Sequence, residues 1–386
     1  MKKIFFFVIA FVSVQTLEAQ TAYNSKYDFV PGEKLIALEN FATTELGDFP
    51  VKWQTNATAE IVTLNDRPGK WLKINKEGVF YPEFITSLPE NFTLEFDLGV
   101  NSGWNEWPFV LNITNLKSPK EYTDYYHYVT WKGVHTIHME FKPGDPGRIA
   151  GSSKLQAGRD GNHEVNNDVE YNTWDNKGIT FAHISLWRQG KRLRAYLNGE
   201  KIWDVQQVFD QDSKYNSITF AAARNNQPDA FFLLSNIRLA VGSADTRNKL
   251  KTERKFTTRG ILFDPNSDVI KPESYGALRE IGLIFQGTDS LTQIKITGHT
   301  DNDGDAALNL DLSKRRAEAV KTYLVREFNL TADRIVTDGK GATMPVDNNT
   351  TIVGKANNRR VDFVMLPITV KTGGDKNLPI TVKPSN

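Results

Sequence analysis

The chain has 386 residues, 39% of them hydrophobic and 24% charged, which is enough for two or three globular domains with sizeable cores. Its net charge of +1 gives no electrostatic reason to expect binding to nucleic acid or to an anionic membrane surface. The absence of cysteine excludes disulfides, cysteine-ligated metal sites and the acylated cysteine of a bacterial lipoprotein.

Residues 1–20 have the pattern of a secretory signal peptide. Two lysines precede an apolar run at residues 4–14, and the predicted cleavage point is near Ala19 or Gln20. The run of about 11 residues is too short to span a bilayer, although a membrane anchor is the competing interpretation. We therefore expect the chain to be secreted through the inner membrane.

Residues 21–242 are predicted to form an all-β domain. Residues 92–98 alternate apolar and polar side chains, as a half-buried strand does. Residues 183–197 read as a hairpin closed by a glycine turn, and Asn198-Gly199 then turns the chain into another strand. The pattern indicates several antiparallel strands.

The succession of strand, turn, strand, Asn-Gly and strand resembles the concanavalin A-like or laminin G-like jelly roll, as do residues 71–74 after Pro68-Gly69. This resemblance implies a sandwich of two packed antiparallel sheets. Residues 144–168 are rich in Gly, Asp and Asn, and we expect them to form a long surface loop.

All eight tryptophans lie in this half of the chain, and most of them are expected to fill the sandwich core or cover its rims. Sugar-binding jelly rolls stack pyranose rings on exposed aromatic side chains. Trp104 and Trp107 are the candidates for such a glycan platform, with Trp131 and a tyrosine cluster at residues 122–128 nearby.

A hydrolase on this sandwich would place carboxylates on one strand in an E-x-D-x-x-E pattern. Glu95 and Asp97 supply the first two positions, but Val100 occupies the third. We interpret the two carboxylates as part of a solvated strand face. His135 and His138 would point to opposite faces of a strand, so we expect no metal site and no cofactor.

Residues 243–259 are basic with little apolar content and are predicted to be a linker. The domain after it, at residues 260–366, is predicted to alternate strands and helices. The predicted elements are strand 260–263, helix 272–285, strand 292–297, helix 316–328 after a Ser313 N-cap, and strands 334–336 and 360–365.

The apolar spacing assigns core positions to both predicted helices. These positions are Leu278, Ile281, Leu283 and Phe285 in the first helix, and Ala317, Val320 and Leu324 in the second. Helices that cover one face of a mixed sheet make an α+β layering.

The most informative stretch runs from Gly298 to Ala317. Asp301 lies just past the carboxyl end of a predicted strand, and Arg316 is placed in the first turn of the following helix. A carboxylate and a guanidinium that face one crevice can hold an amino-acid zwitterion. The alternative is that the two side chains form an ion pair with each other.

Gly298-His299-Thr300-Asp301, followed by Asn309-x-x-Leu312-Ser313-x-x-Arg316-Ala317, resembles the signature of the OmpA-like C-terminal domain. Further segments resemble that family in the same order, at residues 263–266, 270–273, 333–335, 339–341 and 354–361. The resemblance covers about residues 256–366 and implies a βαβαββ α+β domain that binds peptidoglycan.

The resemblance also implies roles for particular residues. The family holds the diaminopimelate of the peptidoglycan stem peptide without cleaving it. Asp301 would then pair with the ammonium at the D-centre and Arg316 with the adjacent carboxylate. Further polar contacts with the ligand are implied for Asn266, Thr300 and Asn309. Of the paired arginines Arg359 and Arg360, either contacts the ligand or forms a structural ion pair, and His299 is structural.

These observations predict two domains in a non-enzymatic, peptidoglycan-binding protein of a Gram-negative bacterium, located in the periplasm at the outer membrane and cell wall. It would tether an outer-membrane or periplasmic partner to the wall, and its jelly roll would engage a glycan or an outer-membrane protein. The alternatives are an outer-membrane β-barrel with a wall-binding module and a glycan-hydrolysing jelly roll anchored to the wall. Residues 367–386 repeat Leu-Pro-Ile-Thr-Val-Lys and are predicted to be a flexible tail.

Overall fold

The computed structural model describes residues 28–101, 108–116, 134–145, 147–160, 162–222, 229–242, 250, 252–288 and 292–367. Several predictions lie outside these residues: the signal peptide at 1–20, the glycan candidates Trp104 and Trp107, Trp131 with its tyrosine cluster, much of the linker, and the tail after residue 367.

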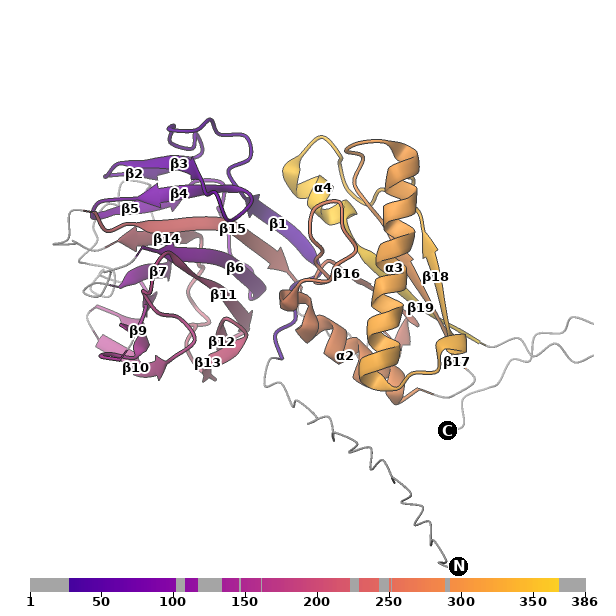
Figure 1. Ribbon diagram of the computed structural model, residues 1–386. Coiled ribbons are helices and arrows are strands. Elements are labelled where there is room, and N and C mark those ends of the chain that lie inside the picture. Colours follow the sequence, from indigo (N-terminus) through magenta and orange to yellow (C-terminus); the bar gives the residue numbers. More distant parts are fainter. Residues whose placement is uncertain are drawn as a thin grey trace, which may run out of the picture.

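The N-terminal domain consists of two antiparallel sheets (Figure 1). The strands of the first sheet are β1 (Lys34–Glu39), β3 (Ala59–Thr63), β4 (Lys70–Ile74), β6 (Asn91–Val100), β11 (Thr180–Gln189), β12 (Arg192–Leu197), β13 (Glu200–Val205) and β15 (Phe232–Val241). The strands of the second sheet are β2 (Trp53–Thr55), β5 (Gly78–Pro82), β7 (Phe109–Thr114), β8 (Thr136–Lys142), β9 (Gly151–Arg159), β10 (Asn162–Tyr171) and β14 (Ser217–Ala222).

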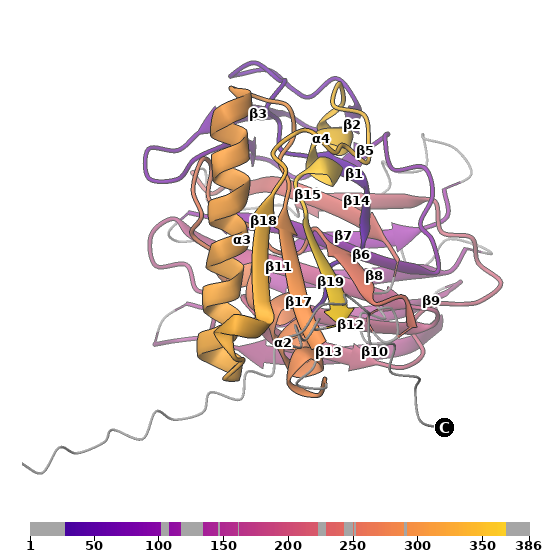
Figure 2. The same cartoon turned by 90° about the vertical axis from the view of Figure 1, so that its right-hand side faces the viewer.

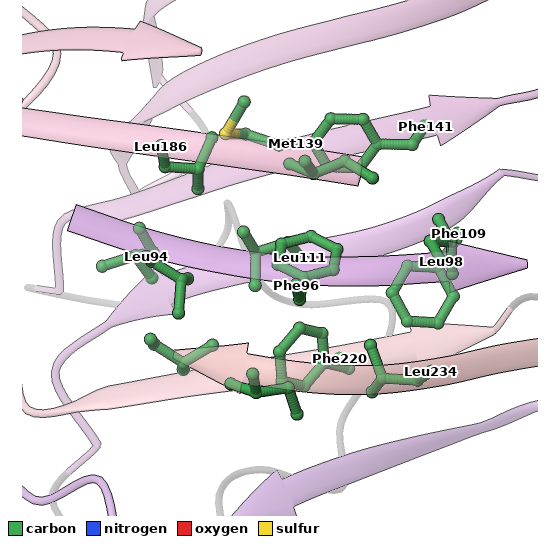
Figure 3. Packing of buried hydrophobic residues seen from close by; sticks show 14 of the residues in the cluster. Leu94, Phe96, Leu98, Phe109, Leu111, Met139, Phe141, Leu186, Phe220 and Leu234 are labelled. Carbon is green, nitrogen blue, oxygen red and sulfur yellow. The ribbon is translucent and has the colours of Figure 1, made fainter. Parts of the chain in front are cut away.

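The first sheet has the order β13-β12-β11-β6-β15-β4-β3, with β1 paired to β15, and the second has the order β10-β9-β8-β7-β14-β5-β2. The inward side chains of both sheets form one apolar core. Phe96 of β6 contacts Phe141 and Phe220 of the opposite sheet edge to face, with ring centroids 6.2 and 5.4 Å apart (Figure 3). The predicted mostly-β domain is therefore confirmed, and the jelly-roll assignment stays a prediction.

The predicted hairpin is present as β11 and β12. Asn198 and Gly199 follow it with φ angles of 50° and 81° and return the chain into β13. This pair of left-handed residues is the conformation that an Asn-Gly hairpin turn requires. The five tryptophans within the described part of the chain are all buried, as the core-or-rim prediction required: Trp53, Trp71, Trp174, Trp187 and Trp203.

Two predictions about this domain were wrong. Residues 144–168 contain the hairpin of β9 and β10 rather than a long loop. β10 is the outermost strand of its sheet and exposes both faces for most of its length, so its polar sequence shows no alternation. Glu95 is not solvated but only 2% exposed. On the outer face of β6, Glu95 lies beside His183 of β11 and Arg238 of β15, and the periodicity of β6 alone could not predict these neighbours.

The C-terminal domain is built on a mixed four-stranded sheet with the order β16-β19-β17-β18. Its elements are β16 (Lys255–Thr258), the 3₁₀ turn η3 (Pro272–Ser274), α2 (Tyr275–Gln286), β17 (Thr292–Gly298), α3 (Ala306–Phe328), the 3₁₀ turn η4 (Ala332–Arg334), β18 (Ile335–Gly339), α4 (Ile352–Asn358) and β19 (Val361–Pro367). β17 and β18 run parallel, whereas β19 is antiparallel to both β17 and β16.

In Figure 2 the C-terminal domain stands in front of the sandwich, and α3 lies alongside β18 and β17. The predicted stripe of Ala317, Val320 and Leu324 is fully buried in a core shared with Ile294 and Ile296 of β17. This confirms the packing of α3 on the sheet. No helix in the described part of the chain is long and apolar enough to cross a membrane.

The boundaries of this domain differ from the prediction at its start. The first strand is β16 at Lys255–Thr258, not residues 260–263, and it lies inside the predicted linker. Leu250 is also fully buried in the C-terminal core. Leu283, predicted as a core residue of α2, is 53% exposed because it lies on the outer side of that helix.

Helix α3 begins at Ala306, well before the predicted start after Ser313. The N-cap is Asp305, whose carboxylate accepts hydrogen bonds from Ala307 N and Leu308 N. Ser313 instead lies buried in the middle of the helix, where its hydroxyl donates to Leu310 O. Helix α4 was not predicted, so the order is βαβαβαβ rather than βαβαββ. The helix has only seven residues, and its two large apolar residues, Ile352 and Val353, are adjacent at its start, so the sequence shows no helical apolar periodicity.

The two domains meet where β1 lies next to α4 (Figure 1). The Asn357 side chain pairs with the backbone of Leu35 like a neighbouring strand: its Oδ1 accepts from Leu35 N at 2.9 Å and its Nδ2 donates to Leu35 O at 3.0 Å. Arg259 donates to Asn357 O and to Glu33 O. Leu35, Ala240 and Ala356 add a small apolar cluster.

Candidate functional site

The predicted site forms around the loop at residues 299–305, between β17 and α3. Gly298 ends β17 at a position where a Cβ atom would collide with Ser313 O of α3. The absence of a side chain therefore lets the helix backbone approach the strand. Arg316 lies one turn farther along the helix and is thereby brought beside the loop.

Asp301 is held rigidly within this loop and is only 7% exposed. Its Oδ1 accepts from Asp303 N at 3.1 Å, and its Oδ2 forms an ion pair with Arg359 Nη1. Thr300 Oγ1 donates to Asp301 O at 2.8 Å, and Asn309 Nδ2 donates to Asp303 O at 2.8 Å. The structure thus brings Thr300 and Asn309 to the site, where their polar atoms hold the loop backbone.

Arg316 does not form the ion pair with Asp301 that was the alternative to ligand binding. Its Nε donates to Ser267 O at 2.9 Å and its Nη2 to Asp264 O at 3.2 Å, while the guanidinium lies over the Phe263 ring at 4.9 Å. Carbonyl oxygens orient a guanidinium but do not neutralise it. Within the described ranges, Arg316 has no carboxylate at ion-pair distance.

The electrostatic environment of Arg316 favours an added anion. Burial lowers the pKa of Arg316 to about 10, the neighbouring charge of Arg359 acts in the same direction, and Asp301 opposes both. A half-buried cation beside a second cation is stabilised by any carboxylate that enters between them.

Asn266 is exposed, with a left-handed φ of 53°, in the turn between Asp264 and Ser267 that supplies the two carbonyls to Arg316. The two adjacent arginines have different ion-pair partners. Arg359 reaches Asp301, whereas Arg360 is almost fully buried and pairs with Asp362 at 3.2 Å.

His299 also belongs to this structural group, since its Nε2 lies 3.0 Å from Asp362 Oδ2 and its side chain is buried. Burial raises the pKa of Asp362, but hydrogen bonding from His299 and the charge of Arg360 outweigh it and hold this pKa below its usual value.

Comparison with known proteins identifies the domain that carries this site. Residues 262–359 match the OmpA family. This part of the chain is an OmpA-like domain. The matched range contains every predicted site residue of the C-terminal half, and it starts after β16, which pairs with the sheet of the same domain.

Three relatives each match about a quarter of this chain. Outer-membrane lipoprotein YfiB of Pseudomonas aeruginosa is 37% identical over 105 residues, which are 27% of this chain and 61% of that protein. Outer membrane porin F of Pseudomonas fluorescens is 39% identical over 102 residues, 26% of this chain and 31% of that protein. Peptidoglycan-binding protein ArfA of Mycobacterium bovis is 41% identical over 105 residues, 27% of this chain and 32% of that protein.

Among solved structures, the cell wall anchor of the type VI secretion system from Pseudomonas aeruginosa is 29% identical, with a TM-score of 0.27. The match covers 31% of this chain and 92% of that one. The chain spans less than two thirds of the length of the relatives YfiB and porin F.

Part of the predicted site faces a cavity that both domains form, although Asp301 itself is not among the residues that line it. Arg316 and Arg359 line a cavity of about 340 Å³ whose other wall comes from the sandwich: Leu38, Asn40, Asp97, His183, Asn236 and Arg238. Sequence reasoning missed this wall. Asp97 of β6 and His183 of β11 are direct cross-strand partners. The polar positions in residues 92–98, together with a histidine in the predicted hairpin strand, were the sequence features that could have pointed to this wall.

The sandwich wall is a network of buried charges. His183 Nδ1 lies 2.7 Å from Asp97 Oδ1, and Asn236 Nδ2 donates to Asp97 Oδ2 at 2.6 Å. Glu95 lies behind them, 3.5 Å from His183 Nε2 and 3.8 Å from Arg238 Nε. Although burial lowers the pKa of His183, the two carboxylates raise it to about 10, so this imidazole is cationic at neutral pH.

Proposed function

We propose that this chain is a non-enzymatic peptidoglycan-binding protein whose OmpA-like domain holds the diaminopimelate of the stem peptide. The observation that carries the proposal is Arg316: a half-buried guanidinium, oriented by two carbonyls, that no carboxylate of the described residues neutralises. A carboxylate of the ligand would accept hydrogen bonds from this guanidinium and neutralise its charge. Charge-assisted hydrogen bonds of this kind contribute about 1.5–3 kcal/mol to binding.

Asp301 supplies the opposite charge for the ligand's ammonium. Its Oδ2 is paired with Arg359, so the ammonium competes with that guanidinium for the carboxylate. Arg359 is 44% exposed and can turn toward the incoming carboxylate, whereas Asp301 is fixed by the loop. The zwitterion would then replace one internal ion pair by two ion pairs with the protein.

The relatives support the same function and a location at the outer membrane or in the periplasm, because they are named as peptidoglycan-binding or outer-membrane proteins. With the predicted signal peptide, the chain would tether an outer-membrane or periplasmic partner to the wall. The sandwich would engage that partner, an outer-membrane protein or a glycan stacked on Trp104 and Trp107.

The carboxylates of the sandwich support a non-enzymatic role. A glycosidase needs one carboxyl group with a raised pKa to act as general acid. Burial raises the pKa of Asp97, but hydrogen bonding from His183 and Asn236 and the charge on His183 outweigh it and lower this pKa below its usual value. Glu95 is fully engaged with His183 and Arg238 as a buried counter-ion.

The test is a pull-down with purified peptidoglycan sacculi. We expect Asp301→Ala and Arg316→Ala each to abolish or sharply weaken binding, while circular dichroism shows a folded protein. Arg315→Ala is the matched control, because Arg315 is the adjacent residue on α3 but forms surface ion pairs with Asp311 and Asp268. Wild-type binding by both site variants would refute the assignment of the site.

A further inference from the structure

A second groove, of about 420 Å³, runs along the solvent-facing flank of α3. Its other side is formed by the turn before α2, with Asp268 and Ile270, and by Tyr275 at the start of that helix. All of its lining residues belong to the OmpA-like domain, so the groove does not depend on how the two domains dock.

Two stacked tyrosines give the groove an aromatic surface. The rings of Tyr275 and Tyr323 have centroids 5.4 Å apart and an interplanar angle of 13°. Of the phenylalanines, tyrosines and tryptophans in the described ranges, Tyr275 alone is exposed, at 43%. Tyr323 is half-buried and is also contacted by the guanidinium of Arg326, 5.8 Å from its ring centroid. The face of Tyr275 that points away from Tyr323 is therefore the one open to a ligand.

Polar groups surround this aromatic surface. Thr322 is exposed on the same flank of α3, and neither its hydroxyl nor the two phenol hydroxyls have a hydrogen-bond partner among the residues that the structure describes. A pyranose ring presents an apolar C–H face with hydroxyl groups around its edge. An aromatic face with hydroxyls beside it matches both parts of such a ring.

The groove begins at the turn that orients Arg316. Arg316 Nε donates to Ser267 O, and the adjacent Arg315 pairs with Asp268 at 2.8 Å at this end of the groove. Tyr323 follows Arg316 by seven residues on α3, which is about 10 Å along the helix axis. A ligand held at Arg316 can therefore extend across the turn toward the tyrosines.

The proposed ligand has a sugar at this distance. Two amino acids of the stem peptide separate the diaminopimelate from the amino sugar that carries the stem. An extended chain advances about 3.3–3.6 Å per residue, so three steps place the sugar about 10 Å from the diaminopimelate.

We propose that Tyr275 and Tyr323 form a sugar subsite, on which an amino sugar of the glycan strand stacks while the diaminopimelate occupies the site at Asp301 and Arg316. The inference rests on the proposed function, which places the stem peptide at those two residues. It makes the OmpA-like domain recognise sugar and peptide together, so that it prefers the wall polymer to free stem peptide.

The test compares two ligands by calorimetric titration of the full chain. One is the disaccharide tetrapeptide that a muramidase releases from diaminopimelate-type sacculi, and the other is the same tetrapeptide with an acetyl group in place of the sugars. We expect the wild type to bind the sugar-bearing ligand about tenfold more tightly, which corresponds to about 1.4 kcal/mol.

The variants separate the aromatic ring from simple packing. Tyr275→Leu keeps an apolar side chain against Tyr323 without an aromatic face, and should lose most of the preference while its affinity for the acetylated tetrapeptide stays within twofold of wild type. Tyr275→Phe keeps the ring and should keep the preference. Leu283→Ala, at an exposed leucine of α2 outside the groove, is the matched control.

The outcomes distinguish this proposal from the proposed function. If the wild type binds both ligands equally, or if Tyr275→Leu retains the preference or weakens both ligands alike, the sugar subsite is wrong and the zwitterion site stands. If the wild type binds neither ligand, the proposed function fails and the subsite fails with it. Arg316→Ala should lose both ligands, which a defect confined to the sugar subsite would not do.

Discussion

Replacing Asn357 by Ala is the sharpest test of how the two domains are joined. The Asn357 amide is 1% exposed and makes two hydrogen bonds to the backbone of Leu35 on β1, in the other domain. Its Nδ2 also donates to Asp347 Oδ2 at 2.8 Å within the OmpA-like domain. Alanine removes all three bonds and cannot replace the strand-like pairing.

The expected cost follows from the groups left behind. A buried backbone donor or acceptor that loses its partner costs about 1–3 kcal/mol, so Leu35 N–H and C=O together cost about 2–6 kcal/mol while the domains stay docked. Water can solvate both groups if the domains separate. We therefore expect the variant to relieve this cost by undocking rather than by unfolding either domain.

The chain carries a separate probe for each domain. All eight tryptophans lie between Trp53 and Trp203, so tryptophan fluorescence reports on the sandwich. Of the described residues, α2, α3 and α4 all belong to the OmpA-like domain, so circular dichroism at helical wavelengths reports on that domain. In urea, the wild type should show coincident transitions and Asn357→Ala two separated ones.

Asn358→Ala is the matched control. Asn358 is equally buried, but its bonds to Val346 N, Asp347 N and Asp347 O stay within the OmpA-like domain. It should destabilise that domain without separating the two transitions. Coincident transitions at the wild-type midpoint in Asn357→Ala would refute the reasoning about the junction.

Two further predictions concern the site and the charge network. Gly298→Ala should lower the free energy of unfolding by about 1–3 kcal/mol and weaken sacculus binding, because the new Cβ displaces the α3 backbone at Ser313; unchanged urea midpoint and binding would contradict this. The pKa of His183 is raised from 6.5 to about 10, so its stabilisation is complete below about pH 6.5 and is lost as pH rises to about 10. The stability gap between wild type and His183→Asn should therefore shrink over that range in urea titrations, and a constant gap would contradict the assigned protonation.

Much of the site was predictable because its residues are close in sequence. The β17 strand, the loop after it and the apolar stripe of α3 are local patterns, and the ordered motifs indicated an OmpA-like domain that the family comparison supports. The start of α3 was missed because Asn309 and the loop acids look like coil. Their role as cap and loop supports appears only once the helix is placed.

The partners of the buried charges could not be predicted in the same way. The sequence shows an acid and a base at a suitable separation, yet Asp301 pairs with Arg359, which is distant in the chain. Glu95 and Asp97 occupy the polar positions of an alternating strand, and alternation alone assigns them to solvent. Glu95 is instead buried beside His183 and Arg238 of the neighbouring strands, and Asp97 lines the cavity that faces the OmpA-like domain.

By itself, the sequence determined the two-part organisation, strand β6 and the β11–β12 hairpin of the sandwich, the apolar stripe of α3 and the chemical groups of the binding loop. Periodicity and turn chemistry are properties of neighbouring residues, and a single chain displays them directly. Only the tertiary structure decided which carboxylate neutralises which cation, where α3 begins, and that Asn357 joins the OmpA-like domain to β1. Such pairings form between residues that are far apart in the chain and meet only when the chain folds, so no pattern of neighbouring residues predicts them.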